Sequence, residues 1–171
     1  MSAIAAEPIP TSRLDLVPLR AGHADEMVTV LAEADLYTFI GGSPPTREAL
    51  RATYERMIAG PADPDICWCN WVIQLRESGR LAGTVQATIS TGDETVAEIA
   101  WVVGTPWQGR GIAKEAAQAL IAWLGRRSVR TVIAHIHPYH HASAAVAAAA
   151  GLTPTDESQD GEIRWRLTMT P

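Results

Sequence analysis

The sequence predicts an α/β (α+β) fold in which helices flank a sheet built around an antiparallel meander. Three apolar segments, residues 68–75, 81–89 and 95–103, are joined only by short polar turns, which is typical of an antiparallel meander. Segments with apolar residues at helical spacing precede and follow this meander. The third strand also runs into a glycine-rich stretch that begins a helix, residues 108–124.

Before the meander, the sequence predicts one strand and two helices. Residues 13–19 alternate apolar and polar side chains and end near a proline, as expected for a strand. Residues 24–34 have the spacing of an amphipathic helix, and a loop rich in glycine and proline follows at residues 40–45. A second helix is predicted over residues 47–59, with Thr46 as its N-cap.

After the glycine-rich helix, the pattern predicts a strand, a helix and a final pair of strands. Residues 130–136 are apolar and β-branched, whereas residues 141–150 form an alanine-rich helix that Gly151 would close. A polar turn at residues 156–161 separates the last two segments, 152–155 and 163–169. The resulting order is β-α-α-β-β-β-α-β-α-β-β.

Length and composition indicate one domain, residues 1–171, because a chain of 171 residues with 47% hydrophobic side chains can bury one large core. Residues 1–11 contain Pro8 and Pro10 and are expected to be a loose leader, without the basic and apolar regions of a signal peptide. Cys67 and Cys69 are expected on opposite faces of one strand. They are therefore interpreted as reduced thiols of a cytoplasmic protein.

The net charge of −5 argues against nucleic acid as the main partner, and no stretch is long enough to span a membrane. Residues 109–130 depart from this acidic average, because Glu115 is the single acid among several basic side chains: Arg110, Lys114, Arg126, Arg127 and Arg130. A basic region on an acidic protein suits a polyanionic cofactor. The alternative is that Arg126 and Arg127 only complement a helix C-terminus.

The stretch Trp107-Gln108-Gly109-Arg110-Gly111-Ile112-Ala113-Lys114 is the candidate site for that cofactor. The first N–H groups of a helix have no partner within the helix, and the helix dipole adds positive potential there. Because glycines let phosphate oxygens approach these groups, the stretch predicts a diphosphate site. It fits neither the dinucleotide pattern G-x-G-x-x-G nor the nucleotide loop G-x-x-x-x-G-K-[ST]. The alternative is a glycine-rich turn without a ligand.

The pattern Q-x-x-G-x-A, from Gln108 to Ala113, resembles the acetyl-CoA diphosphate loop of the GCN5-related N-acetyltransferases, the GNAT superfamily. Residues 12–20 resemble the opening strand of its ribosomal-protein alanine acetyltransferase branch, and the order of elements is also that of the superfamily. The resemblance covers nearly the whole chain. It implies a GNAT fold, with a central mixed sheet that is twisted, mostly antiparallel and flanked by helices. It also implies an acetyl-CoA-dependent N-acetyltransferase, with acetyl-CoA as co-substrate.

The resemblance also implies which residues bind the cofactor. The backbone of Trp101, Val102 and Val103 would bind the pantetheine amides in a gap between splayed strands. The diphosphate would lie on the loop and first helical turn, formed by Gln108, Gly109, Arg110, Gly111, Ile112, Ala113 and Lys114. The Arg110 side chain would also reach a phosphate. His140 replaces the family's asparagine and would donate a hydrogen bond toward the pantetheine.

The second family motif, x-P-x-N-x-x-S, corresponds to residues 137–143, in which Pro138 and Ser143 match. Ser143 would face the CoA thiol as a catalytic residue; alternatively, its hydroxyl bonds the backbone at the start of a helix. Many members carry a tyrosine that protonates the leaving thiolate, but Ala147 stands at this position, and Leu152 replaces the usual phenylalanine. The proton donor is therefore unassigned.

Glu98 is the candidate general base. An alkyl ammonium has a pKa of about 10.4, so very little of an amine acceptor is the free nucleophile at neutral pH. Glu98 stands at an acidic position common in this branch and would remove the proton directly or through water. The alternative, which the sequence favours equally, is that Glu98 forms a cross-strand charge pair.

The histidines His135, His137, His140 and His141 raise the question of zinc, but no carboxylate at ligand spacing joins them, so we expect no metal site. The family resemblance places the acceptor against the first two helices, with Trp68 and Trp71 as candidate lining residues. The expected acceptor is a primary amine of a small molecule or a protein N-terminus. The alternatives are a non-catalytic CoA- or acyl-CoA-binding module and the transfer of a longer acyl group. A homodimer is left open.

Overall fold

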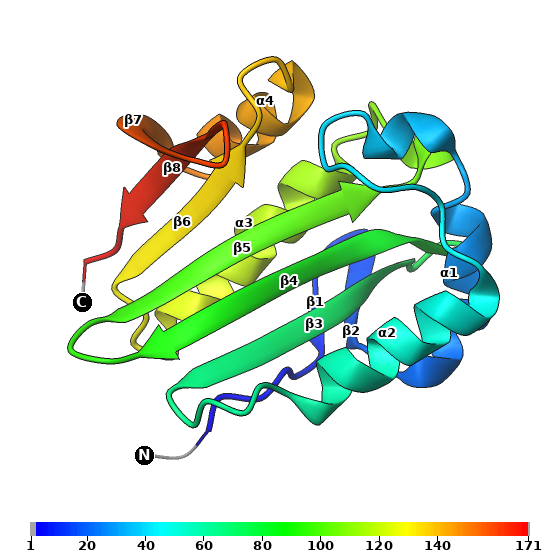
Figure 1. The fold of residues 1–171 in the computed structure, drawn as a ribbon, viewed down its shortest axis with the longest axis horizontal. Coiled ribbons are helices and arrows are strands. Elements are labelled where there is room, and N and C mark those ends of the chain that lie inside the picture. Colours follow the sequence, from blue (N-terminus) through cyan, green and yellow to red (C-terminus); the bar gives the residue numbers. More distant parts are fainter. Residues whose placement is uncertain (1–2, 171) are drawn as a thin grey trace.

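The structure, a computed structural model, describes residues 3–170, which build one eight-stranded sheet (Figure 1). The strands lie in the order β1-β2-β3-β4-β5-β6-β8-β7. Their bounds are β1 Ile9–Pro10, β2 Leu14–Pro18, β3 Ile66–Leu75, β4 Leu81–Thr91, β5 Thr95–Val103, β6 Thr131–Ile136, β7 Thr153–Gln159 and β8 Glu162–Thr168. All neighbouring strands are antiparallel except β5 and β6, which are parallel. The prediction of a mixed, mostly antiparallel sheet is confirmed.

Four α-helices accompany the sheet within the described residues: α1 (Ala24–Val30), α2 (Arg47–Ala59), α3 (Ile112–Gly125) and α4 (His141–Ala149). In Figure 1, α3 passes behind β4 and β5, while α1 and α2 lie at the right of the view, next to β4 and β3 respectively. Buried leucines of α3, Leu120 and Leu124, share one hydrophobic core with Ile89 of β4 and Ile99 of β5. Since strand side chains alternate between faces, α3 covers the one face of β4 and β5 that carries these residues.

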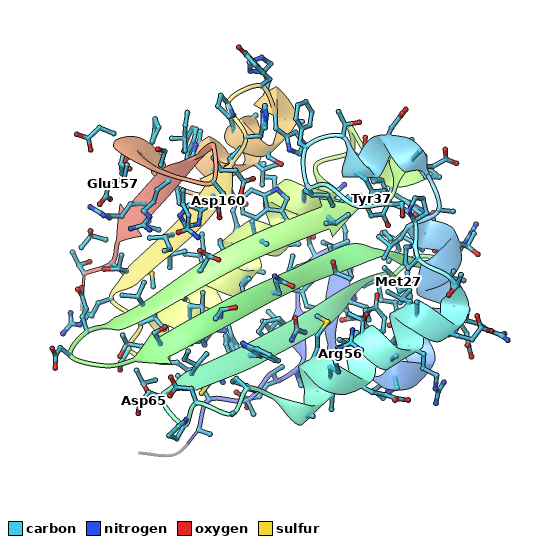
Figure 2. All side chains as sticks on the ribbon, in the orientation of Figure 1. Met27, Tyr37, Arg56, Asp65, Glu157 and Asp160 are labelled. Carbon is cyan, nitrogen blue, oxygen red and sulfur yellow. The ribbon has the colours of Figure 1, made fainter. Side chains whose placement is uncertain are left out.

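The other face of the central strands is open and points toward the reader in Figure 1. Gln86 and Ser90 of β4 and Glu98 and Ala100 of β5 are exposed there and alternate with buried residues. In Figure 2, Tyr37 from the linker between α1 and α2 and Asp160 from the β7–β8 turn lie on either side of the ends of β5 and β6. The open face is thus bordered by two connecting segments.

Several elements have the predicted bounds. α2 begins and ends where expected, and Oγ1 of Thr46 accepts a hydrogen bond from the amide of Ala49 over 3.1 Å, which confirms the N-cap. The meander β3-β4-β5 is also confirmed. The last hairpin differs, because β7 extends to Gln159 and the turn shrinks to Asp160 and Gly161.

The glycine-rich helix begins later than predicted. We expected it from residue 108, but α3 begins at Ile112. Gly109 and Gly111 have φ angles of 76° and 75°, which a right-handed helix does not accommodate. Both glycines therefore belong to a loop before the helix. The first helix is also shorter than predicted, because α1 ends at Val30 and a separate 3-10 turn follows at Ala34–Tyr37.

Residues 3–11 are not the loose leader that we expected; Met1 and Ser2 lie outside the described residues. Ile9 is buried, and β1 pairs with β2. Nε1 of Trp71 donates a hydrogen bond to the carbonyl oxygen of Glu7 over 2.7 Å, and the Glu7 carboxylate pairs with Arg127. These contacts hold the segment against the core, and no local sequence pattern indicates them.

Cys67 and Cys69 are both free thiols. The expectation that they lie on opposite faces is wrong, because residues i and i+2 of a strand share a face. Both pack on the core, and burial, together with the nearby Cys67, raises the pKa of the Cys69 thiol to about 12. Between residues 3 and 170, no helix combines the length and apolar character that a bilayer crossing requires.

Candidate active site

β5 and β6 pair at one end and separate toward the other. Their parallel register covers only residues 96–98 of β5, although β5 continues to Val103. β6 remains paired with β8 as far as Ile136, so the divergence lies between β5 and β6. The gap expected next to the strand before the glycine loop is therefore present.

The backbone of β5 beyond Glu98 faces this gap at alternate residues. The carbonyl of Thr95 accepts a hydrogen bond from the amide of Arg130, which precedes β6, so the backbone groups of Trp101 and Val103 point to the same side. Val102 faces β4 instead. A Cβ added to Gly83 would lie 2.1 Å from the Val102 carbonyl oxygen, so only glycine at this position lets β5 remain close to β4.

Gln108 connects the glycine loop to the end of β5. Its Nε2 donates a hydrogen bond to the carbonyl oxygen of Val103 over 3.0 Å. This bond occupies one of the backbone groups that were expected to bind pantetheine. Trp101 has no β6 residue in register, so both its N–H and its C=O are directed into the gap.

A cavity of about 630 Å³ lies at the open end of the gap. Its walls come from the end of β5, the glycine loop with the first turn of α3, the segment before α4, and the linker between α1 and α2. It brings together most of the predicted site residues, namely Trp101, Val102, Val103, Gln108, Gly109, Gly111, Ile112, Ala113, Lys114, His140 and Ser143. Arg110 and Glu98 do not line it.

The glycine loop presents free N–H groups to this cavity. The first backbone bond of α3 runs from the amide of Glu115 to the carbonyl of Gly111 over 3.0 Å, and no side chain caps the helix at Gly111. The amides of Ile112, Ala113 and Lys114 therefore have no partner within the helix. Together with the helix dipole and the two left-handed glycines, they form a concave site suited to an anion.

His140 and Ser143 border the cavity at the start of α4. Nε2 of His140 lies 3.3 Å from Oγ of Ser143. Burial, and to a smaller extent His137, lowers the pKa of His140 below the ordinary value of 6.5, so its imidazole is neutral at neutral pH. A neutral imidazole retains one N–H donor and one acceptor for a ligand or for Ser143.

Phe39 is a cavity residue that the sequence reasoning missed. Its ring stacks on His140 with a centroid separation of 4.7 Å and an interplanar angle of 18°, and it lies 5.0 Å from the His137 ring. The stack joins the linker between α1 and α2 to the segment before α4. The linker has no hydrophobic periodicity, and the one available signal was that Phe39 is the chain's single phenylalanine.

Glu98 lies on the open face, where β5 and β6 stop pairing. Nδ1 of His135 lies 2.7 Å from Oε1 of Glu98, and Nε of Arg164 donates to Nε2 of His135 over 3.1 Å. Because arginine can only donate, the proton of a neutral His135 is on Nδ1 and points to the carboxylate. Glu98 is thus half-exposed and held by a nearly buried histidine. Glu98 therefore has a cross-strand hydrogen-bond partner, rather than the charge pair that was the alternative to the base role, and its carboxylate stays accessible.

The remaining predicted residues are placed as follows. His135 contacts Glu98, whereas His137 and His140 contact Phe39, and within residues 3–170 no three His, Cys, Asp or Glu side chains are grouped to hold a metal ion. Trp71 is fully buried and cannot line an open acceptor pocket, while Trp68 is 41% exposed.

Comparison with known proteins decides the family. The acetyltransferase (GNAT) domain matches residues 13–153, which is most of the chain. The chain belongs to the GNAT acetyltransferase family. No curated protein gives a significant match.

Solved structures share the GNAT fold over nearly the whole chain. RimL, a ribosomal L7/L12 alpha-N-protein acetyltransferase solved with coenzyme A, is 19% identical with a TM-score of 0.81, covering 95% of this chain and 98% of that chain. An acetyltransferase from Agrobacterium tumefaciens str. C58 is 25% identical with a TM-score of 0.73, covering 99% and 98%. The microcin C7 self immunity acetyltransferase MccE, solved with acetyl-CoA and AMP, is 15% identical with a TM-score of 0.76, covering 93% and 94%.

This GNAT chain departs from the family pattern at the start and in the middle of α4. Ala147 is fully buried and carries no hydroxyl where many members have a tyrosine. His140 replaces the asparagine and is stacked on Phe39. The tyrosine hydroxyl of those members is therefore missing at this position.

Proposed function

We propose that this GNAT protein is an acetyl-CoA-dependent N-acetyltransferase acting on a primary amine of a small molecule or a protein N-terminus. One observation carries the proposal: a single cavity joins the gap between β5 and β6 to the glycine loop before α3. Coenzyme A has a diphosphate at one end and a thioester on a long arm. An anion site that continues into a gap between strands suits both parts.

In the proposed complex, the diphosphate accepts hydrogen bonds from the free amides around Gly111 and Ala113, and Lys114 adds positive charge. The Trp101 N–H and C=O bond the pantetheine amides as a neighbouring strand would. Arg110 has no part in lining the cavity, so we assign the loop's contribution to its backbone. The thioester then lies near the point where β5 and β6 diverge, between Glu98 and Ser143.

The amine nitrogen attacks the thioester carbonyl carbon; the N–C bond forms, the C–S bond breaks, and the CoA thiolate takes up the proton that the nitrogen loses as it becomes an amide. Attack requires the free amine, and Glu98 accepts the proton that the ammonium loses, directly or through water. His135 holds the carboxylate in place through its Nδ1–H. Positioning of amine and thioester together contributes further, on the order of several kcal/mol.

Two similar structures suggest the class of acceptor. RimL is named for acetylating the ribosomal protein L7/L12, and the MccE structure contains AMP beside acetyl-CoA. Because both folds are similar to this one, we propose both a protein N-terminus and a small amine as acceptors. The open face next to Glu98 gives either acceptor a route to the thioester.

A second candidate function is a CoA- or acyl-CoA-binding module without turnover. The observation that favours it is the α4 region, where Ala147 removes the usual acid and His140 replaces the usual asparagine. Such a module would use the same cavity. The two functions differ in the fate of the thioester, not in where the cofactor binds.

Thiol release from acetyl-CoA separates these functions when it is measured with a panel of amines. The panel pairs a peptide with a free N-terminus against the same peptide with an acetylated N-terminus, and adds amino acids and polyamines. Release that depends on a free amine, with the acetylated product seen by mass spectrometry, supports the transferase. Tight CoA binding without acetylation of any amine supports the module. A parallel series with butyryl-CoA tests longer acyl groups.

A further inference from the structure

A cluster of hydrogen bonds connects the N-terminal segment to the back of the glycine loop. Both oxygens of Glu115, in the first turn of α3, are occupied. Oε2 accepts from Oγ1 of Thr11 over 2.5 Å and from the amide of Arg13 over 3.0 Å, and Oε1 accepts from Nε of Arg13 over 2.7 Å. Nη1 of Arg13 then donates to the carbonyl oxygen of Arg110 over 2.9 Å. One guanidinium thus bridges the loop and the helix.

The bridge acts on a specific peptide group of the loop. In a planar trans peptide, the C=O of one residue and the N–H of the next point in opposite directions. Since the carbonyl of Arg110 is held by Arg13 on the side away from the cavity, the N–H of Gly111 points the other way. Gly111 lines the cavity, whereas Arg110 does not. A reversed peptide would instead direct a carbonyl oxygen at the diphosphate and repel it.

The glycine at position 111 also fits against this bridge. Gly111 has a φ angle of 75°, and a Cβ added there would lie 3.4 Å from Nη2 of Arg13. The guanidinium therefore packs directly behind the loop and does not extend into the cavity. Its charge is balanced by the carboxylate of Glu115, which is mostly buried.

We propose that Arg13 and Glu115 are positioning residues that hold the glycine loop in its anion-binding conformation before the cofactor arrives. The inference deepens the proposed function, because it assumes that the loop binds the diphosphate of coenzyme A. It assigns the effect to geometry, since the Arg13–Glu115 pair adds little net charge to the loop. Arginine is required because its planar fork can donate to Glu115 and to the Arg110 carbonyl at once, which a lysine ammonium cannot do in the same arrangement.

The test measures coenzyme A affinity by calorimetry for the full chain and its variants. Arg13→Gln is expected to weaken binding about tenfold or more, as is Arg13→Lys. Arg76→Gln is the matched control: Nη1 of Arg76 donates to the carbonyl of Thr11 over 2.7 Å, so it anchors the same segment without contacting the loop. This control is expected to bind coenzyme A within about twofold of the wild type.

A second set of variants addresses folding and mechanism. Glu115→Gln is expected to weaken coenzyme A binding as well, and the double variant with Arg13→Gln should lose no more than about the larger single loss, because both changes break one unit. When formation of the acetylated amine is measured, the KM for acetyl-CoA should rise, while kcat at saturating acetyl-CoA is retained. A purely structural role would lower the melting temperature without this split.

The outcomes separate the inference from the function on which it rests. Wild-type affinity in Arg13→Gln, or full affinity restored by Arg13→Lys, overturns the inference while the CoA site stands. An equal loss in Arg76→Gln also overturns it, because anchoring of the segment would then explain the effect. A wild-type protein that does not bind coenzyme A removes the proposed function and the inference together.

Discussion

Nδ1 of His135 lies 2.7 Å from Oε1 of Glu98, at the level where β5 and β6 stop pairing. One strand of the gap thus supplies an accessible carboxylate, and the other supplies the group that holds it. Both positions follow from the parallel register, which places these side chains on the open face of neighbouring strands. The arrangement puts a proton acceptor beside the proposed position of the thioester.

Glu98→Gln is expected to lower kcat by about 100-fold or more, because an amide cannot accept the amine proton. Coenzyme A affinity should stay unchanged, since Glu98 does not line the cavity. The measurement is steady-state acetylation across pH, in which the variant should lose the dependence on a deprotonated base. Glu94→Gln is the control, because Glu94 precedes β5 at its paired end, away from the gap, and accepts a hydrogen bond from Oγ1 of Thr131 at the start of β6. Equal kcat values for Glu98→Gln and the wild type would show that Glu98 has only a structural role, as the partner of His135.

Gly111→Val is expected to weaken coenzyme A binding by more than about tenfold while the fold remains intact. A β-branched residue at a φ of 75° is strained and would displace either the loop or Arg13. Gly60→Val is the matched control, because Gly60 has a φ of 84° but ends α2, away from the loop. Calorimetric affinity and circular dichroism check the two properties separately. Unaltered affinity in Gly111→Val would count against the loop as the diphosphate site.

The Glu115 carboxylate should make the free energy of unfolding depend on pH in the acid range. Burial raises the pKa of its carboxyl, but hydrogen bonds from Thr11 and Arg13 outweigh burial and leave the pKa below the ordinary value of 4.5. The charged form is therefore favoured by folding, so its stabilisation is complete above the ordinary pKa and is lost as pH falls through the folded-state pKa. Urea unfolding should show Glu115→Gln less stable than the wild type at neutral pH, by about 1–3 kcal/mol, with the difference shrinking in acid. A difference that does not change with pH would contradict this reading.

Chelation is expected to change neither activity nor melting temperature. His135 is bonded to Glu98 and Arg164, and His140 is stacked on Phe39, so these two histidines have other partners. Thermal melts and acetylation rates before and after treatment with a strong chelator check this expectation. A fall that is reversed by added zinc would show that a metal site has been overlooked.

The order of helices and strands along the chain, apart from β1, was predictable because strands and helices leave local periodic patterns. The glycine loop was also predictable, since Gly109 and Gly111 mark a backbone conformation that few other residues adopt. The start of α3 was placed wrongly for the same reason: the pattern shows that glycines are needed, but the sign of φ decides whether they lie inside the helix or before it.

Other features depend on contacts between distant parts of the chain. Arg13 and Glu115 are separated by 102 positions, and neither has a neighbour in sequence that indicates the pair. Phe39 lies in a linker without periodicity, and His135 was considered only as a metal ligand. The N-terminal segment was expected to be loose because two prolines and a two-residue strand give no pattern. Such partners follow from tertiary packing, which spacing along the chain does not encode.

The most direct test is a crystal structure of the protein with coenzyme A. We expect the diphosphate on the amides of the loop before α3, the pantetheine amides on the Trp101 backbone between β5 and β6, and the sulfur close to Glu98. A nucleotide bound elsewhere, or a complex in which those amides are bonded to other parts of the protein, would contradict it.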